Sequence, residues 1–296
     1  MFRKISLVVC IFFAALTWPA LHAYSNDELS DWDPAAWLAR TSGEINFDNG
    51  EFSGTLNTIQ PLFLSADGRH TGFVQGRINY DNGRQDWTAN GGIGYRFLFP
   101  GDQWMLGANA WLDHTFEHDH WRLGIGGELF GPHLTARANY YQGLTGWQTV
   151  SATTTTRVEQ KVVDGFDGSL EAPLPHLPWA RLSLGGYYWD FESIDEEAGV
   201  RAQLQMNLTP SLTVRGGMDL SDDDERYFVQ ARLFLGQPAH VAFNALDDGI
   251  SDVAFVPRPV ISQRLAPVER TQTVVVEQRT ISTTGISGGV RIGGSI

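Results

Sequence analysis

The chain has 296 residues, of which 42% are hydrophobic and 12% aromatic, with one cysteine and a formal net charge of −13. This composition excludes a disulfide-stapled mini-protein, a collagen and a disordered tail, because it holds too much apolar material and too few cysteines. The acidic balance argues against nucleic acid as a partner, since phosphate binding needs a basic surface.

The N-terminal region has the features of an export signal. Arg3 and Lys4 precede an apolar run at residues 5–16, and Ala23 offers a small residue at which a signal peptidase cuts. An uncleaved anchor is the alternative, but the run is shorter than the ~20 residues that span a bilayer. We therefore predict a signal peptide at residues 1–23 and a periplasmic N-terminal segment at residues 24–42.

A short helix is predicted within this periplasmic segment. Asp33 is a suitable N-cap residue and Pro34 fits the first helical position. The expected helix covers residues 33–40.

Between residues 43 and 235, hydrophobicity alternates with a period of two, as in β-strands. For example, Leu106 and Leu112 share one parity, while Asn109 and Asp113 share the other. Twelve alternating runs are expected, and an even number is typical of bacterial membrane barrels. The runs are 43–49, 52–65, 71–81, 86–98, 104–116, 120–130, 133–145, 164–173, 179–192, 197–208, 211–221 and 225–235.

The polar face of these runs separates a membrane barrel from a soluble β-sandwich. A sandwich would carry many Lys and Glu residues there, whereas this face carries single arginines among Gly, Asn, Gln and Ser, with occasional carboxylates. Arginine forks pair well with carboxylates across a narrow polar lumen. The predicted lumen-lining residues are Arg77, Arg96, Asp113, Arg122, Glu128, Arg137, Asp167, Glu171, Arg181, Arg201, Arg215, Asp219 and Arg232.

Aromatic residues near the ends of the runs, including Tyr187 and Trp189, are expected to form girdles at the membrane interfaces. The predicted fold is therefore all-β: a transmembrane antiparallel up-and-down β-barrel of about 12 strands, with a short N-terminal helix and an extended C-terminal tail. We expect it to contact lipid in the outer membrane of a Gram-negative bacterium.

The segments outside the strands also have expected places. Residues 149–163 form the longest and most polar loop, which we expect outside the cell. Residues 236–296 form a linker and short tail whose first part, up to Arg270, contains four prolines and should be irregular or extended. Such a segment would find backbone partners inside a polar lumen, and exposure in the periplasm is the alternative.

No recognisable catalytic, cofactor or metal motif is found. The acidic and histidine residues of segment 113–120 resemble metal ligands, but their position at a hairpin tip favours a solvated turn. Residues 222–225 are acidic but lack the spacing and glycine of a calcium loop. We expect no catalytic residue, no metal and no cofactor, although an outer-membrane enzyme can assemble its site from scattered loop residues.

Several spaced motifs carry a family resemblance. The segments 122–128 (RLGIGGE), 138–141 (ANYY), 146–147 (GW) and 165–167 (GFD) resemble the β-barrel domain of inverse autotransporters, the intimin and invasin family. Residues 264–270 (RLAPVER) resemble the linker that follows the barrel in this family. The resemblance extends from about Trp37 to Leu235.

The resemblance implies a twelve-stranded barrel, inserted by the barrel-assembly machinery, through which the following chain reaches the surface. In the family, surface domains bind host receptors or other cells. Here 61 of the 296 residues follow Leu235, too few for an immunoglobulin-like domain, so a surface or host ligand stays unidentified. The predicted function is translocator and anchor for the chain's own C-terminal segment, with a passive porin-like channel or structural barrel as the alternative.

Overall fold

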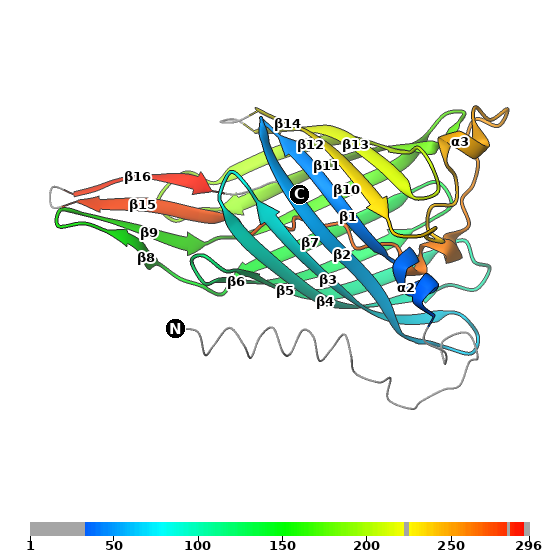
Figure 1. Ribbon diagram of the computed structural model, residues 1–296, viewed down its shortest axis with the longest axis horizontal. Helices are drawn as coiled ribbons and strands as arrows, with labels where there is room; N and C mark the ends of the chain where they lie inside the picture. Colours follow the sequence, from blue (N-terminus) through cyan, green and yellow to red (C-terminus); the bar gives the residue numbers. More distant parts are fainter. Residues whose placement is uncertain (1–32, 222–224, 283–284, 293–296) are drawn as a thin grey trace.

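The computed structural model describes residues 33–221, 225–282 and 285–292, most of which form one closed barrel (Figure 1). Within these residues the barrel has twelve strands in the order β1-β14-β13-β12-β11-β10-β7-β6-β5-β4-β3-β2. Neighbouring strands are antiparallel, and β1 closes the barrel by pairing Ser42 with Phe234 of β14. The strands are β1 (Thr41–Asp48), β2 (Glu51–Leu64), β3 (His70–Asp81), β4 (Asp86–Leu98), β5 (Met105–Thr115), β6 (His120–Phe130), β7 (Thr135–Gly143), β10 (Asp164–Leu174), β11 (Leu177–Asp190), β12 (Glu197–Asn207), β13 (Leu212–Ser221) and β14 (Glu225–Phe234). The predicted twelve-stranded antiparallel barrel is confirmed.

The barrel wall has an apolar outer face and a polar inner face. Leu106, Ile125 and Leu184 are 51%, 53% and 56% exposed on the outside, whereas Asp113 and Arg122 are fully buried on the inside. Successive side chains of a strand point to opposite faces, so the alternating sequence produces both surfaces at once. An apolar exterior around a polar interior is the arrangement of a membrane barrel.

The predicted N-terminal helix is present as α2 (Pro34–Ala39). The side-chain carboxylate of Asp33 accepts a hydrogen bond from the backbone N–H of Ala35 at 2.9 Å, as expected for an N-cap. The predicted signal peptide at residues 1–23 lies outside the described residues. Among the helices in the described part of the chain, none has the length and apolar character to cross a membrane.

The two ends of the barrel differ. We call the end at which β1 begins and β14 ends the terminal mouth, and the opposite end, where residues 144–163 connect β7 to β10, the loop mouth. The helices α2 and α3 (Ala245–Asp248) lie at the terminal mouth, while β8 (Gln148–Ala152) and β9 (Thr156–Val162) project beyond the loop mouth (Figure 1).

The hairpin formed by β8 and β9 was not predicted, because residues 149–163 were expected to be a loop. The hydroxyl of Thr153 accepts a hydrogen bond from the N–H of Thr156 at 3.0 Å and closes the turn. The β-branched residues on both sides favour an extended conformation. A polar run can therefore form strands when a threonine turn joins its two halves.

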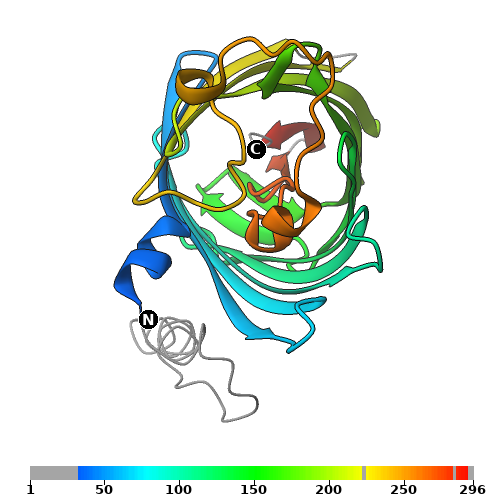
Figure 2. The ribbon, with the colours of Figure 1, turned by 90° about the vertical axis from the view of Figure 1, so that its right-hand side faces the viewer.

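After β14 the chain folds back into the barrel. Residues 236–259 cross the terminal mouth, the 3-10 helix η1 (Val260–Leu265) follows, and residues 266–275 extend through the lumen, as Figure 2 shows from the terminal mouth. The chain then forms β15 (Val276–Ser282) and β16 (Gly285–Ile292), giving a second sheet in the order β16-β15-β9-β8.

The tail contains more helix than the sequence predicted. The four-residue α3 lies between Pro238 and Pro257, and η1 begins directly after Pro259. Proline breaks a helix interior but is compatible with the residues that flank a helix start. The prolines therefore separate these short helices without preventing them.

Two of the expected girdle residues lie inside the barrel instead. Tyr187 and Trp189 are buried and form an apolar cluster with Tyr141, Val163 and Val275 near the loop mouth. They share the inward parity of Arg181 in β11, whose inward positions are buried. Position near a strand end indicated a girdle, but parity decides which face a side chain occupies.

Candidate functional site: the occupied lumen

All thirteen predicted lumen residues lie on the inner face of the wall, where most of them pair with one another. Arg96 contacts Glu128 at 2.8 Å, and Arg122 contacts Asp113 at 2.8 Å. The remaining pairs are Arg137 and Arg181 with Glu171, and Arg201 with Asp219. Four residues pair with groups outside the predicted set: Arg77 with Glu44, Arg215 and Arg232 with Glu269, and Asp167 with Tyr141 and Asn139.

The most buried cluster joins the wall to the tail. The carboxylate of Asp113 accepts hydrogen bonds from Arg122 at 2.8 Å and from Asn90 at 2.8 Å. It also accepts two from the guanidinium of Arg270, at 2.9 and 2.6 Å. The Arg270 guanidinium lies 4.9 Å from the centroid of the Trp111 ring. A buried charge is tolerated only when it is paired and hydrogen-bonded. The Asp113 carboxylate meets this condition and forms a specific buried binding site for the Arg270 side chain of the tail.

Arg96 and Arg122 also bind the backbone of the tail. One nitrogen of Arg96 donates to the carbonyl oxygens of Gln263 at 3.0 Å and Ala266 at 2.7 Å. Arg122 donates to those of Thr271 and Thr273, both at 2.8 Å. An extended segment has no internal backbone partners, and these guanidinium groups provide donors for its carbonyl oxygens.

Glu269 fixes the opposite side of the tail. Its carboxylate accepts two hydrogen bonds from Arg215 of β13, at 2.8 and 2.5 Å, and one from Arg232 of β14 at 3.3 Å. Neighbouring side chains of an extended chain point in opposite directions. Glu269 therefore contacts one wall of the barrel while Arg270 contacts the other, and a shift of one residue would break both contacts.

The next residue is held by the backbone as well as the side chain. The N–H of Thr271 donates to the hydroxyl of Tyr141 at 2.8 Å, and its hydroxyl donates to Asp167 at 2.8 Å. Gly124 gives the tail room nearby, because a Cβ at this position would lie 2.9 Å from a nitrogen of Arg270.

At the loop mouth the tail becomes a strand. β15 pairs with β9 from Val276 opposite Val162 to Ser282 opposite Thr156. The fully buried Glu277 accepts hydrogen bonds from the N–H groups of Glu192 at 2.9 Å and Ser193 at 2.6 Å. The hairpin thus adds the tail to its free edge, which is the geometry of β-strand addition.

A side-chain cluster reinforces this pairing. Arg279 of β15 contacts Glu159 of β9 at 3.0 and 2.8 Å, and its guanidinium lies 3.9 Å from the Trp147 ring. The tail is consequently bound at both ends of its passage through the barrel.

Sequence reasoning missed Glu44, Glu269, Arg270 and Glu277. Glu44 shares the inward parity of β1, which would have identified it. The signal for Glu269 and Arg270 is a pair of adjacent opposite charges in an extended segment that was itself expected in the lumen. Glu277 carried no local signal, because its partners lie in the loop between β11 and β12.

The segment considered for metal binding is divided between the inside and the rim. Asp113 is bound by arginines, His114 pairs with Asp119 at 2.9 Å, and His120 contacts the side-chain amides of Gln148 and Gln160. Among the residues that the structure describes, no group of three His, Cys, Asp or Glu side chains is placed to hold a metal ion. Residues 222–224 of the acidic loop lie outside the described residues.

A closed barrel with an apolar exterior and a polar lumen defines the class of outer-membrane β-barrels. This chain belongs to the inverse autotransporter family, because the family model described as the inverse autotransporter β-domain matches residues 15–272. The predicted family resemblance is confirmed.

Individual relatives agree with this assignment. Intimin from Escherichia coli O127:H6 is 30% identical over 219 residues, which cover 69% of this chain and 22% of that intimin. Intimin from Citrobacter freundii is 32% identical over 160 residues, covering 52% and 16% of the two chains. The chain thus spans a small part of the length of the intimins it matches.

A solved structure, described as "Unveiling the Mechanism Behind the in-meso Crystallization of Membrane Proteins", is similar in fold. The match has a TM-score of 0.64 and 22% sequence identity, and covers 80% of this chain and 99% of the other. At this level of identity the similarity supports the barrel fold.

Proposed function

We propose that this protein is a translocator and outer-membrane anchor for its own C-terminal segment. The observation that carries the proposal is the path of the tail, which leaves β14 at the terminal mouth and pairs with β9 at the loop mouth. Membrane barrels have short periplasmic turns and longer extracellular loops, so the mouth with the 144–163 connection faces the outside. On this orientation the tail has crossed the membrane inside the barrel.

The contacts of the tail support a role as an anchor. Opposite charges at Glu269 and Arg270 fix its register, and the wall arginines hold its backbone. The apolar outer face provides the contact with outer-membrane lipid, and we propose that the barrel-assembly machinery inserts it.

Surface labelling tests the proposal. An epitope is fused after Ile296 and labelled on intact and on permeabilised cells. Two controls carry the epitope elsewhere: one at Thr154, in the turn of the β8–β9 hairpin, and one at Gly68, in a turn at the terminal mouth. We expect the first control to label on intact cells and the second only after permeabilisation. The proposal requires the Ile296 epitope to behave like the Thr154 control, and behaviour like the Gly68 control would contradict it.

A passive channel is the competing function, and it requires an open lumen. The tail opposes it, because Arg96, Arg122 and Asp113 on the wall are occupied by tail atoms rather than facing an open path. Steady conductance by the unmodified protein in planar lipid bilayers would favour the channel.

A further inference from the structure

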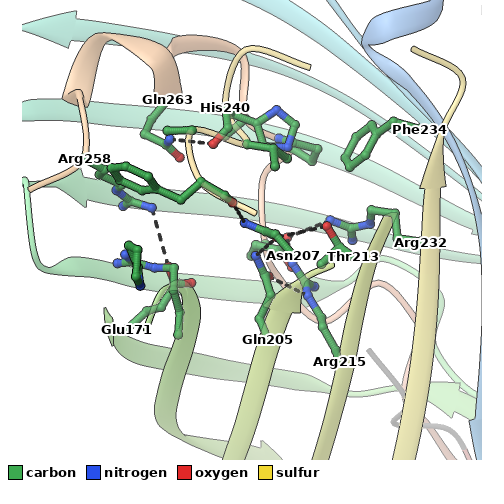
Figure 3. Close-up of a pocket in the computed structure, with 18 of the residues that line it drawn as sticks. Glu171, Gln205, Asn207, Thr213, Arg215, Arg232, Phe234, His240, Arg258 and Gln263 are labelled. Atoms are coloured by element: carbon green, nitrogen blue, oxygen red, sulfur yellow. Dashed lines mark hydrogen bonds and ion pairs between the residues drawn. The ribbon is translucent and has the colours of Figure 1, made fainter. Parts of the chain in front are cut away.

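A cavity remains beside the tail at the terminal mouth. It contains about 690 Å³ of atom-free space, part of it open to solvent. The ends of β7 and of β10 to β14 form one side, and tail residues including His240, Arg258 and Gln263 form the other (Figure 3). Wall and tail therefore meet around a common space.

This cavity has a surplus of positive charge. Its lining includes five arginines and two glutamates, a formal charge of +3 in a chain whose net charge is −13. Glu171 is shared by Arg137 at 3.0 Å, by Arg181, and by Arg258 at 3.7 Å. One carboxylate cannot neutralise three guanidinium groups, and buried charges without full compensation are costly.

Some of the arginine nitrogens also lack acceptors. Among the described residues, no group accepts a hydrogen bond from Nε of Arg137, Nη2 of Arg181 or Nε of Arg258. The three side chains are 10%, 7% and 9% exposed, so they are largely removed from bulk solvent. A buried donor without an acceptor costs free energy, and an added acceptor would remove that cost.

We propose that this cavity is a binding site for a small multivalent oxyanion of the size of phosphate or sulfate. A tetrahedral oxyanion supplies several acceptor oxygens and at least two negative charges, and guanidinium groups bind such anions with paired hydrogen bonds after small rotations. The cavity lies within the closed barrel, so the ion comes from the solution at the terminal mouth rather than from a lipid headgroup. Since Arg258 belongs to the tail while Arg137 and Arg181 belong to the wall, the bound ion would join the two.

The test is a calorimetric titration of the refolded full-length protein in detergent with inorganic phosphate, at constant ionic strength set with chloride. We expect one saturable site per barrel. Arg258→Gln and Arg181→Gln should each weaken phosphate binding at least tenfold. The matched control is Arg157→Gln, which removes a half-exposed arginine of β9 at the opposite mouth and should leave the affinity unchanged.

The outcomes are distinct. Absence of saturable binding by the unmodified protein would overturn the proposal, as would equal affinities in all variants. Heat-modifiable migration in gel electrophoresis shows that each variant has folded before it is titrated. Two cavity variants are used because loss of folding in one leaves the other as a test. Surface labelling of the tail does not enter this experiment, so failure of the anion site leaves the translocator proposal unaffected.

Discussion

Arg270 provides a direct way to weaken the docking of the tail without changing the wall. In Arg270→Gln, Asp113 keeps Arg122 and Asn90 as partners, so the barrel should fold. The variant loses two hydrogen bonds between charged groups, at 2.9 and 2.6 Å, each contributing about 1.5–3 kcal/mol. The glutamine amide recovers about 1 kcal/mol through a neutral bond, which leaves a loss of about 2–5 kcal/mol.

This loss should appear as more frequent release of the tail. A change of about 2–5 kcal/mol corresponds to an increase of about 30-fold to 4000-fold in the undocked population. Hydrogen exchange measured by mass spectrometry on peptides covering residues 266–276 reports this population, because docked amides exchange only on opening. We expect protection there to fall by the same factor, while peptides of β5 and β6 stay protected.

The control is Arg264→Gln, the same substitution in the preceding helix η1. The Arg264 side chain makes no hydrogen bond or ion pair with the described residues, and only its carbonyl oxygen is used, by Arg96. Protection of residues 266–276 that is equal in Arg270→Gln and Arg264→Gln would refute the reasoning.

Three further predictions concern the outer face, the pH dependence and the space around the tail. Ile125→Arg should destabilise the barrel by about 2–4 kcal/mol, because this outward side chain meets the bilayer midplane. Leu134→Arg, at the rim, should cost only about 0–1 kcal/mol. Urea unfolding in lipid vesicles measures both changes. Burial, followed by repulsion from an arginine, lowers the pKa of His240 to about 3 in the folded protein. In the unfolded chain this histidine binds a proton near pH 6.5. Its effect on the free energy of unfolding is therefore absent above about pH 6.5, and the free energy of unfolding falls as the pH decreases toward 3. The urea midpoint should therefore fall less in His240→Gln than in the unmodified protein between pH 7.5 and pH 5, and equal falls would contradict this assignment. Gly124→Val should displace Arg270, because even a Cβ would lie 2.9 Å from its guanidinium, and bilayer recordings should show more open events than in the unmodified protein.

The barrel could be predicted because the pattern that identifies each strand lies within the residues of that strand. Alternation identifies each strand, and parity places Arg122 inside and Leu123 outside without knowledge of any partner. The same rule would have placed Tyr187 inside had parity been given more weight than proximity to the strand end. The twelve alternating runs found in the sequence then correspond to the twelve strands of the barrel.

The path of the tail was less predictable because its contacts join distant parts of the chain. Arg270 contacts Asp113 across 157 positions, and Arg279 contacts Glu159 across 120. Neither pairing leaves a periodic pattern in the sequence. Proline content and the polar lumen predicted an extended segment inside the barrel, but not its register or its pairing with β9.

The central claim is that the tail crosses the lumen and pairs with the β8–β9 hairpin at the cell surface. Val158 and Thr280 lie directly opposite each other in that pairing. Opposite Cα atoms of antiparallel strands are about 4.5–5.5 Å apart, within the range of a disulfide. Val158→Cys combined with Thr280→Cys, with the single native Cys10 replaced by alanine, provides a specific cross-link.

Intact cells carrying this pair are oxidised, and the cross-link is detected by peptide mass spectrometry. The control combines Val158→Cys with Gln278→Cys, whose partner in the sheet is Gln160, so its two positions are diagonal neighbours about 7–8 Å apart. The account predicts a cross-link for the first pair but not for the control. A membrane-impermeant maleimide added before oxidation should prevent the cross-link of the first pair, because both cysteines lie at the cell surface. Absence of the cross-link, or its formation despite the maleimide, would contradict a tail that is docked at the cell surface.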